Sequence, residues 1–388
     1  VAENINVNIS DFNEVYRVIK NHNIDIVVVG PEEPLVNGIV EFLNEKGTRV
    51  LGPDKFASQL EGSKAFMKDL CKKNNIPTAK FGVFEEFNSA VNFLIQNKIP
   101  IVVKADGLAA GKGVTICKSV EEAKEKIKEI LGGKYKSSKK VVLEEFLEGE
   151  ELSYFSIVDK NSYQFFGSAQ DHKKVGEGDT GPNTGGMGAY SPSNLLTNKL
   201  EEKIKKKIIN PTLKAMESLG HPYRGFLYAG LMISKGEPYL IEYNIRMGDP
   251  ECQVLMMRLK TDLLEIIDYA TKDKLNNLKI EWGNSDCITI VLCAKGYPGN
   301  YIKDSEIKNL PGIISDETNQ IFHAGTYEKN EKIFSNGGRV LNITALGKDL
   351  IEARNKSLMK LKKINWNDGF FRKDIGWRAI KKNEDNQR

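Results

Sequence analysis

The N-terminal residues combine a short apolar run with a stretch of helical periodicity. The run that begins at Asp25, Ile-Val-Val-Val-Gly, predicts a buried strand of parallel type. Apolar residues then recur at the spacing of an amphipathic helix that Gly47 ends: Leu35, Ile39, Val40, Phe42 and Leu43. A short second strand is expected at 49–51. This order of strand, helix and strand is typical of an α/β domain, which we expect to stop near residue 60.

The rest of the chain divides in the same way into short apolar runs and periodic stretches. The runs predict strands at 101–104, 114–117, 141–144, 152–158, 162–169, 226–234, 239–244, 286–294, 323–326 and 339–345. The periodic stretches predict helices that end at 73 and helices at 89–97, 120–131, 201–219, 251–270 and 348–364. Residues 171–190 carry almost no periodicity, and loops of that length in compact domains are usually functional or disordered.

Composition adds bounds on the class of protein. The 388 residues are 40% hydrophobic and 28% charged, which excludes wholesale disorder and provides for large cores. A net charge of +4 is too small to predict a surface that coats nucleic acid, so any polyanion is expected to be small and locally bound. No apolar run approaches the roughly 18 residues of a spanning helix, and no signal pattern opens the chain. We therefore expect a cytoplasmic protein with neither a nucleic-acid nor a membrane partner.

The cysteines and histidines exclude several chemistries. The five cysteines are scattered without a Cys-x-x-Cys pair and are expected to be reduced, buried thiols. The four histidines lie too far apart for a zinc-ligand set, and no Gly-x-Ser-x-Gly elbow is present. Zinc-dependent hydrolysis and serine acyl transfer are therefore poor hypotheses.

The glycine-rich segment 104–113 invites comparison with a Walker A loop, and the comparison fails. No Ser or Thr follows Lys112, and the next residues predict a strand rather than a helix. In a strand-loop-strand unit, the amides of Gly111 and Gly113 could form an anion nest toward which Lys104 points a cation. The alternative is a plain glycine-rich hairpin with solvated lysines.

An acidic segment follows the strand at 141–144. Glu144 could accept a hydrogen bond from an adenine amino group, the backbone of Phe146 and Leu147 could contact the ring edge, and Glu151 could bind ribose hydroxyls. A solvated acidic connection explains the same residues. The position of the segment after a candidate phosphate loop favours the nucleotide interpretation.

A third motif lies at the end of the strand at 239–244. Glu242, Asn244 and Arg246 alternate along the chain and are expected to project from one face. A carboxylate and an amide oxygen suit Mg²⁺, and a guanidinium suits a transferring phosphoryl group. The alternative is an edge strand with an internal salt bridge.

Two further segments are candidates for ligand contact. The stretch from Asp171 to Tyr190 combines acidic, basic and threonine side chains with many glycines, beyond the needs of a surface linker, although an exposed flexible loop is the alternative. The segment from Gly30 to Leu35 lies where strand ends and helix N-termini gather ligands in open α/β sheets. Ordinary proline capping of a helix explains that segment equally well.

Taken in order, these segments resemble the ATP-grasp superfamily and, within it, the family of glycinamide ribonucleotide synthetases. The resemblance rests on nine strings that span nearly the whole chain, of which the one at Asp171 discriminates best: VVVGPEEPL from Val27, GSKAFMK from Gly62, VVKADGLAAGKGV from Val102, LEEFLEGEELS from Leu143, DHKKVGEGDTGPNTGGMGAYSP from Asp171, EYNIRMGDPE from Glu242, HAGT from His323, GGRVL from Gly337 and FRKDIGWRA from Phe371.

The resemblance implies an α/β (α+β) fold in three parts. Residues 1–61 would be an N-terminal Rossmann-like substrate domain, 62–285 an ATP-grasp domain with a lid at about 78–148, and 286–388 a small mixed α/β domain. Two departures stand out. Nothing precedes Val1, where the family has a first strand and a GSGGREHA-type turn, so the first domain is expected to be truncated. The strand 226–232 offers no acid opposite Glu242, where many relatives place another metal ligand.

The implied activity is ATP-dependent ligation of glycine to 5-phosphoribosylamine through glycyl phosphate, in purine biosynthesis. The implied partners are these small molecules, and the implied cofactor is Mg²⁺ or Mn²⁺. The protein is expected to be a monomer or a weak homodimer. By the same resemblance, Arg246, Lys104, Asp171 and Asp249 are the expected catalytic residues, and Glu242 and Asn244 the expected metal ligands. The nucleotide is expected to contact Lys64, Lys104, Gly111, Lys112, Gly113, Glu144, Phe146, Leu147 and Glu151. The other substrates are expected to contact Glu32, Pro34, Leu35, Asp171, Lys173, Thr184, Gly185, Gly186, Met187 and Gly248.

Two rival functions compete with this hypothesis. Another ATP-grasp enzyme, such as a carboxylase of the biotin or aminoimidazole type, would share the nucleotide motifs but not the string at Asp171. A nucleotide-binding module without activity is the second rival. The retention of Glu242, Asn244, Arg246, Lys64 and Lys104 together counts against it.

Overall fold

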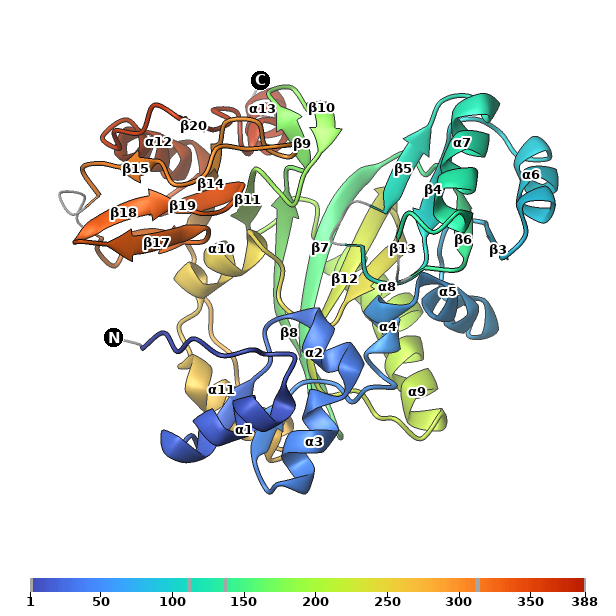
Figure 1. Ribbon diagram of the computed structural model, residues 1–388, viewed down its shortest axis with the longest axis horizontal. Helices are drawn as coiled ribbons and strands as arrows, with labels where there is room; N and C mark the ends of the chain where they lie inside the picture. Colours follow the sequence, from blue (N-terminus) through green and yellow to red (C-terminus); the bar gives the residue numbers. More distant parts are fainter. Residues whose placement is uncertain (1–2, 110–112, 136–137, 311–314, 387–388) are drawn as a thin grey trace.

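The computed structural model describes residues 3–109, 113–135, 138–310 and 315–386, and Figure 1 shows their arrangement. The N-terminal residues lie below a large sheet, the segment around α6 and α7 projects at one upper side, and the C-terminal residues lie at the other. None of the helices in these ranges is long and apolar enough to cross a membrane.

The N-terminal part contains a two-stranded parallel sheet of β1 (Ile26–Val28) and β2 (Arg49–Leu51), as the sequence predicts. The same part contains helices α1 (Phe12–Asn21), α2 (Glu32–Asn37), α3 (Ile39–Glu45) and α4 (Gln59–Gly62), of which α3 packs on β2. The single helix expected before Gly47 is wrong. Gly38 adopts a φ of +95° there, a left-handed conformation that ends α2 and begins α3.

A nine-stranded sheet forms the centre of the molecule. Its strands lie in the order β13-β12-β7-β8-β11-β14-β19-β16, with β20 beside β14, and every adjacent pair is antiparallel. Their bounds are β7 (Glu150–Val158), β8 (Tyr163–Asp171), β11 (Gly188–Ser191), β12 (Gly225–Ser234), β13 (Glu237–Asn244), β14 (Asp286–Ala294), β16 (Asn319–His323), β19 (Arg339–Gly347) and β20 (Gly369–Phe370). The pairing of β11 with β14 makes one sheet of the central and C-terminal parts.

The expected loop from Asp171 to Tyr190 is wrong in part. Strand β8 continues to Asp171, β9 (Lys174–Gly176) and β10 (Thr180–Asn183) form a hairpin, and β11 enters the large sheet. Alternation of apolar residues could not reveal these strands, because β10 is exposed on both faces and β11 is buried on both.

The segment expected to form a lid is a separate unit of α+β type. Its four-stranded antiparallel sheet has the order β3-β6-β4-β5, with bounds β3 (Phe81–Phe84), β4 (Ile101–Ala105), β5 (Val114–Cys117) and β6 (Val141–Glu145). Helices α6 (Phe87–Ile95) and α7 (Val120–Leu131) cover one face of this sheet, and Figure 1 shows the other face turned toward the large sheet. We call residues 78–148 the lid lobe.

The remaining helices are more segmented than the sequence suggests. The expected helix at 201–219 is divided into α8 (Asn198–Ile204), a π-helical turn (Lys205–Ile209) and α9 (Asn210–Ser218), and the one at 251–270 into α10 (Glu251–Arg258) and α11 (Leu263–Thr271). The single strand expected at 323–326 is wrong, because β16 ends at His323, β17 begins at Thr326, and the two residues between them are a bend. The other elements are α5 (Lys64–Lys73), a 3-10 turn (Leu275–Asn277), β15 (Glu306–Ile307), β17 (Thr326–Lys329), β18 (Lys332–Ser335), α12 (Leu350–Leu361) and α13 (Trp377–Asn386).

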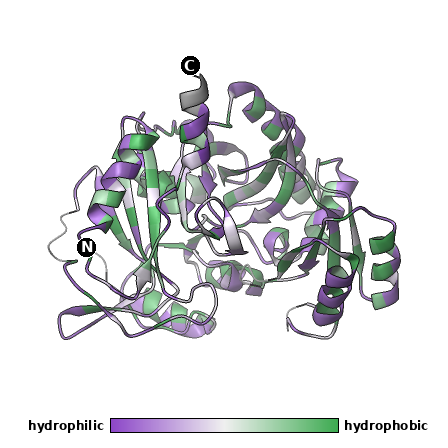
Figure 2. Ribbon diagram, turned by 90° about the horizontal axis from the view of Figure 1, so that it is seen from above, coloured by the Kyte–Doolittle hydropathy of each residue, from purple (hydrophilic) through white to green (hydrophobic). Residues whose placement is uncertain are grey.

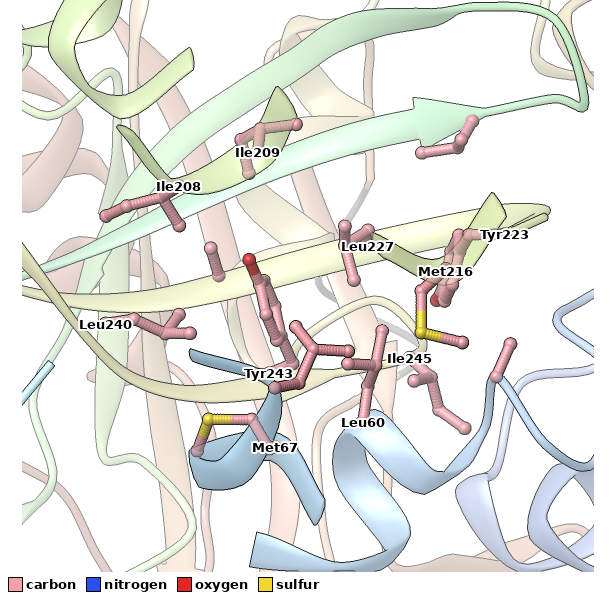
Figure 3. Packing of buried hydrophobic residues seen from close by; sticks show 14 of the residues in the cluster. Leu60, Met67, Ile208, Ile209, Met216, Tyr223, Leu227, Leu240, Tyr243 and Ile245 are labelled. Carbon is pink, nitrogen blue, oxygen red and sulfur yellow. The ribbon is translucent and has the colours of Figure 1, made fainter. Parts of the chain in front are cut away.

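One hydrophobic core holds α4 and α5 against the edge of the large sheet and thereby fixes the site. Figure 3 shows Leu60 and Met67 packed with Leu227, Tyr243 and Ile245 and with side chains of the π-helical turn and α9. The hydroxyl of Tyr243 lies 2.6 Å from that of Thr212, so its polar end is satisfied inside this core. Figure 2 shows the apolar residues concentrated on strands and on inward helix faces.

Candidate active site

Two adjoining cavities lie between the lid lobe, the end of β13 and the segment 171–185. The larger has a volume of ≈ 520 Å³ and the smaller ≈ 200 Å³. Lys173, Thr184 and Glu242 line both cavities. Of the expected residues, the larger cavity is lined by Glu32, Lys64, Gly113, Asp171, Lys173, Thr184, Gly185, Glu242, Asn244, Arg246, Gly248 and Asp249. The smaller is lined by Lys104, Glu144, Phe146, Leu147, Glu151, Lys173, Thr184 and Glu242.

The smaller cavity has the character expected of a nucleoside site. Apolar side chains of the lid sheet and of Phe146 and Leu147 form much of its wall, while Lys104 and Glu144 supply charge. Lys64 lies at the neighbouring cavity, where its ammonium donates to the carbonyl of Gly107 at 3.1 Å. Burial lowers the pKa of Lys64. Gly111 and Lys112, which complete the predicted phosphate loop, lie outside the described residues.

Glu144 lies between two lysines at the wall of this smaller cavity. Its Oε2 is 2.8 Å from Nζ of Lys68 and its Oε1 is 2.9 Å from Nζ of Lys104. Burial alone would raise the pKa of Glu144, but the two ammonium groups outweigh it and hold that pKa below its usual value. Glu144 lines the smaller cavity with each of its oxygens facing an ammonium group, and its expected contact with an adenine amino group stays a prediction.

Arg246 lies between two carboxylates of the N-terminal part at the wall of the larger cavity, the inverse of Glu144 between its two lysines. Its Nε donates to Glu32 at 2.8 Å and its Nη2 to Glu61 at 2.9 Å. Glu61 also accepts from the backbone N–H of Ile245 at 2.8 Å. Burial raises the pKa of Glu61 to about 7 despite the opposing effect of Arg246. We call Glu32, Arg246 and Glu61 the arginine cluster, and Lys68, Glu144 and Lys104 the lysine cluster.

Glu242 and Asn244 are the hard oxygen donors of the predicted metal site, Glu242 at the shared wall of the two cavities and Asn244 in the larger cavity. Strand β12 places Gly230 opposite Glu242, so the predicted lack of a facing acid is confirmed at this position. The described residues contain no group of three or more His, Cys, Asp or Glu side chains that could hold a metal. Two protein donors fit Mg²⁺, which commonly takes its other ligands from phosphates and water. Asn244 Oδ1 also lies 3.4 Å from Nη2 of Arg246, so the amide faces a competing cation.

Asp171 and Lys173 enter the larger cavity from the end of β8. Burial raises the pKa of Asp171 above its usual value, against the effect of the Lys173 ammonium. Burial alone would lower the pKa of Lys173, but the carboxylates of Asp171 and Glu151 outweigh it and raise that pKa. The ammonium of Lys173 lies 2.6 Å from Glu151 Oε2. This ion pair connects a residue of the larger cavity to a residue that lines the smaller one.

Side chains of the C-terminal part hold the segment 171–185 in place. Arg339 donates to the carbonyls of Gly185 at 2.7 Å and Asp249 at 2.6 Å, and pairs with the Asp249 carboxylate at 2.8 Å. Arg372 is fully buried and bonds to the carbonyl of Lys174 and to the carboxylate of Asp179, both at 2.9 Å. These contacts attach both ends of the β9–β10 hairpin to the C-terminal part.

Four of the residues expected to contact a substrate line neither cavity. Leu35 and Met187 are completely buried in separate hydrophobic cores, so their side chains have no surface with which to meet a substrate. Pro34 and Gly186 are also buried and line neither cavity. Gly186 instead orients the side chain of Thr184, because the N–H of Gly186 donates to Oγ1 of Thr184 at 3.0 Å.

Several residues at the site were not assigned a role from the sequence. Glu251, Tyr228 and Arg339 line the larger cavity, and Tyr228 and Ser153 donate to Oε1 of Glu251 at 2.9 and 3.2 Å. Lys68 and Glu61 complete the two charged clusters. Lys68, Glu251 and Arg339 belong to strings that carry the family resemblance, which is the signal that could have found them.

Comparison with solved structures and curated sequences separates the fold from the family. A phosphoribosylamine–glycine ligase of Thermotoga maritima is 37% identical, covers 90% of this chain with 85% of its own, and superposes with a TM-score of 0.77. The biotin carboxylase domain of the Hydrogenobacter thermophilus 2-oxoglutarate carboxylase gives a TM-score of 0.75 at 18% identity, over 94% of this chain and 81% of its own. The second similarity shows the ATP-grasp fold alone.

The sequence comparisons cover the whole chain. A phosphoribosylamine–glycine ligase of Brucella melitensis is 46% identical over 388 residues, which are 100% of this chain and 91% of that protein. The models of the phosphoribosylglycinamide synthetase N domain, ATP-grasp (A) domain and C domain match residues 1–61, 62–252 and 287–378. With matches over well more than half of its length and a relative this similar, the chain belongs to the phosphoribosylglycinamide synthetase family.

Proposed function

We propose that this chain ligates glycine to 5-phosphoribosylamine at the expense of ATP, giving glycinamide ribonucleotide, ADP and phosphate, the second step of de novo purine biosynthesis. The observation that carries the proposal is the shared wall of the two cavities. Glu242, Lys173 and Thr184 line both, so a nucleotide in the smaller cavity and an amine in the larger would meet there.

In the first step, the glycine carboxylate attacks the γ-phosphorus of ATP, and the bond to the bridging oxygen breaks to give glycyl phosphate and ADP. Two anions must approach each other, so nearby cations lower the barrier. Lys64 and Lys104 have this role, and at 4 Å and an effective dielectric of 20 one charge contributes about 4 kcal/mol before desolvation. That energy corresponds to roughly three decades of rate.

Glu242 and Asn244 would hold Mg²⁺ or Mn²⁺ at this wall. The ion, when bound, neutralises charge on the phosphate oxygens. Arg246 orients Glu32 and Glu61 through its two ion pairs and borders the glycine, with Gly248 and Asp249 beside it.

In the second step, the amine of phosphoribosylamine attacks the acyl carbon, phosphate leaves, and the nitrogen loses one proton. Asp171 is the proposed acceptor of that proton. It lines the larger cavity, and burial raises its pKa above the usual value, which brings it closer to that of a base useful near neutral pH. Glu32, Lys173, Thr184 and Gly185 are the proposed contacts of the ribosylamine.

The lid lobe has the task of excluding water from the acyl phosphate. Its glycine-rich loop already touches the body of the molecule, because Ser63 donates to Asp106 at 3.1 Å and Lys64 to Gly107. We expect these contacts to be exchanged for phosphate contacts as the lobe closes over ATP.

The test is ADP release by the purified chain with Mg-ATP, with glycine and phosphoribosylamine supplied singly and together. Release that requires both substrates supports the proposal. Release with bicarbonate instead of glycine would support the rival carboxylase and overturn it. Glu242→Gln is expected to abolish metal-dependent ADP release while ATP still binds, and a variant with near-normal turnover would remove the metal assignment.

A further inference from the structure

Lys68 is a buried lysine that lines neither cavity. It follows Lys64 by one turn on α5, and its side chain is 0% exposed. Its ammonium donates to Glu144 Oε2 at 2.8 Å and to Oγ1 of Thr78 at 2.6 Å. Burial lowers the pKa of Lys68, and these two contacts offset part of the cost of keeping an ammonium group out of water.

The two oxygens of Glu144 are divided between two lysines of different position. Lys104, on Oε1, lines the smaller cavity, whereas Lys68, on Oε2, lies behind it. The negative charge of Glu144 is thus shared between two ammonium groups. In the absence of Lys68 it would act on Lys104 alone and cancel more of the Lys104 charge at the cavity wall.

We propose that Lys68 is a positioning residue for nucleotide binding, which acts by holding Glu144 so that the ammonium of Lys104 stays oriented and available at the smaller cavity. The inference rests on the proposed function only in taking the ligand of that cavity to be a nucleotide. Lys68 itself touches no ligand in this arrangement.

A second contact ties the same ammonium to the junction of the lid lobe with the large sheet. Thr78, at the start of the lobe, accepts from Lys68 and donates to the carbonyl of Leu240 at 2.6 Å, two residues before Glu242. Glu144 lies on β6 of the lobe. Lys68 thus fixes the lobe strand that carries Glu144 relative to the strand that carries Glu242.

The test compares Lys68→Met with Lys68→Arg and with Lys72→Met, an exposed lysine of the same helix. Calorimetric titration with ATP and with ADP reports the affinity, and steady-state kinetics report KM for ATP and for glycine. We expect Lys68→Met to lower the affinity for ATP at least tenfold and to change the KM for glycine less than twofold. Lys68→Arg keeps a cation on Glu144 and should lose less, and Lys72→Met should match the unaltered protein.

A double substitution tests whether Lys68 acts through Glu144. In a Glu144→Gln background, we expect Lys68→Met to cause no further loss of ATP affinity. A further tenfold loss in that background, or unchanged ATP affinity in folded Lys68→Met, overturns the proposal. Thermal melting identifies the folded variants. If Lys68→Met does not fold, the ATP affinity of Glu144→Gln is compared with that of the double variant, and a further tenfold loss in the double variant overturns the proposal.

These outcomes remain distinct from failure of the proposed function. ATP and ADP titrations involve neither glycine nor phosphoribosylamine. A protein that binds ATP in a Lys68-dependent way but shows no glycine-dependent turnover would refute the function and keep the inference. Normal ligase turnover with no role of Lys68 in ATP affinity would do the reverse.

Discussion

At the lid end of the site one carboxylate lies between two ammonium groups, whereas at the N-terminal end one guanidinium lies between two carboxylates. The lysine cluster is almost completely buried, while the arginine cluster keeps partial access to solvent. The two clusters contain the same kinds of group in inverse proportion, and both border the cavities.

The acids of the two clusters respond to burial in opposite ways. Two cations hold the pKa of Glu144 low, so this carboxylate stays charged. One cation shared by Glu32 and Glu61 does not suffice for both, and burial raises the pKa of Glu61 to about 7. The lysine cluster therefore keeps its single acid ionised beside two basic side chains, which suits a nucleotide polyphosphate, whereas Glu61 of the arginine cluster changes its charge near neutral pH.

Removal of the central acid of the lysine cluster should have the largest effect. Glu144→Gln leaves two buried ammonium groups facing each other, and we expect a loss of about 3–5 kcal/mol in unfolding free energy. The substitution should also lower the affinity for ATP, because Lys104 loses its ion pair with Glu144. ADP release should stay dependent on glycine. Denaturant unfolding and ATP titration measure the two effects. Unchanged stability would show that the two lysines do not depend on Glu144.

Removing the central cation of the arginine cluster should have a smaller effect. Arg246→Met leaves Glu32 and Glu61 without their shared partner, and partial exposure limits the expected loss to about 1–3 kcal/mol. The loss should be larger at pH 8 than at pH 5.5, because protonation of Glu61 relieves the repulsion at the lower pH. Unfolding at both pH values provides the measurement, with Arg246→Lys as control. An equal loss at the two pH values would contradict the proposed charge change.

Glu61→Gln should change the free energy of unfolding in a way that depends on pH. A carboxyl with a raised pKa in the fold favours folding below about pH 4.5, and this contribution is lost as pH rises through about 7. The glutamine does not ionise, so we expect it to raise stability by about 1–3 kcal/mol at pH 8 and by almost nothing at pH 4.5. A stability difference that shrinks as pH rises would refute the raised pKa.

The smallest effect is expected at a second Lys–Glu–Lys arrangement on the surface. Glu237 pairs with Lys203 and Lys207 in the same one-to-two proportion as Glu144, but the three side chains keep access to solvent, with exposed fractions of 26% for Lys203, 40% for Glu237 and 45% for Lys207. Glu237→Gln should leave unfolding and ATP affinity within experimental error, since water and salt screen exposed pairs. A loss comparable with that of Glu144→Gln would show that geometry rather than burial controls the effect.

Local pattern predicted the fold wherever one element has one periodicity. Strands β5 and β14 and helix α7 begin and end at the predicted residues. The pattern failed where a break depends on conformation rather than polarity, as at Gly38, and where strands are buried or exposed on both faces, as in β11 and β10. The ATP-grasp fold and the family followed from motifs, which the comparisons confirm.

The site was predictable as a set of chain segments but not as a set of contacts. The strings around Glu144, Asp171 and Glu242 lie at the same pair of cavities. Sequence could not show that Glu144 is divided between two lysines from α5 and β4, since Lys68 and Lys104 meet only through tertiary packing. It also could not separate Thr184, which lines the cavities, from Met187 three residues later, which is part of a core.

The pairing of β11 with β14 also limits how the chain can be divided. Four consecutive residue pairs, from Gly188 with Ile290 to Ser191 with Cys287, join the two strands. Separate expression of the two parts divided between residues 285 and 286 would leave the N–H and C=O groups that join β11 to β14 unpaired. Each part would then have an exposed sheet edge that can pair with another chain and aggregate. The four described strands of the lid lobe pair only with one another, so a graft or exchange of modules is better placed at the borders of the lobe than at the C-terminal boundary.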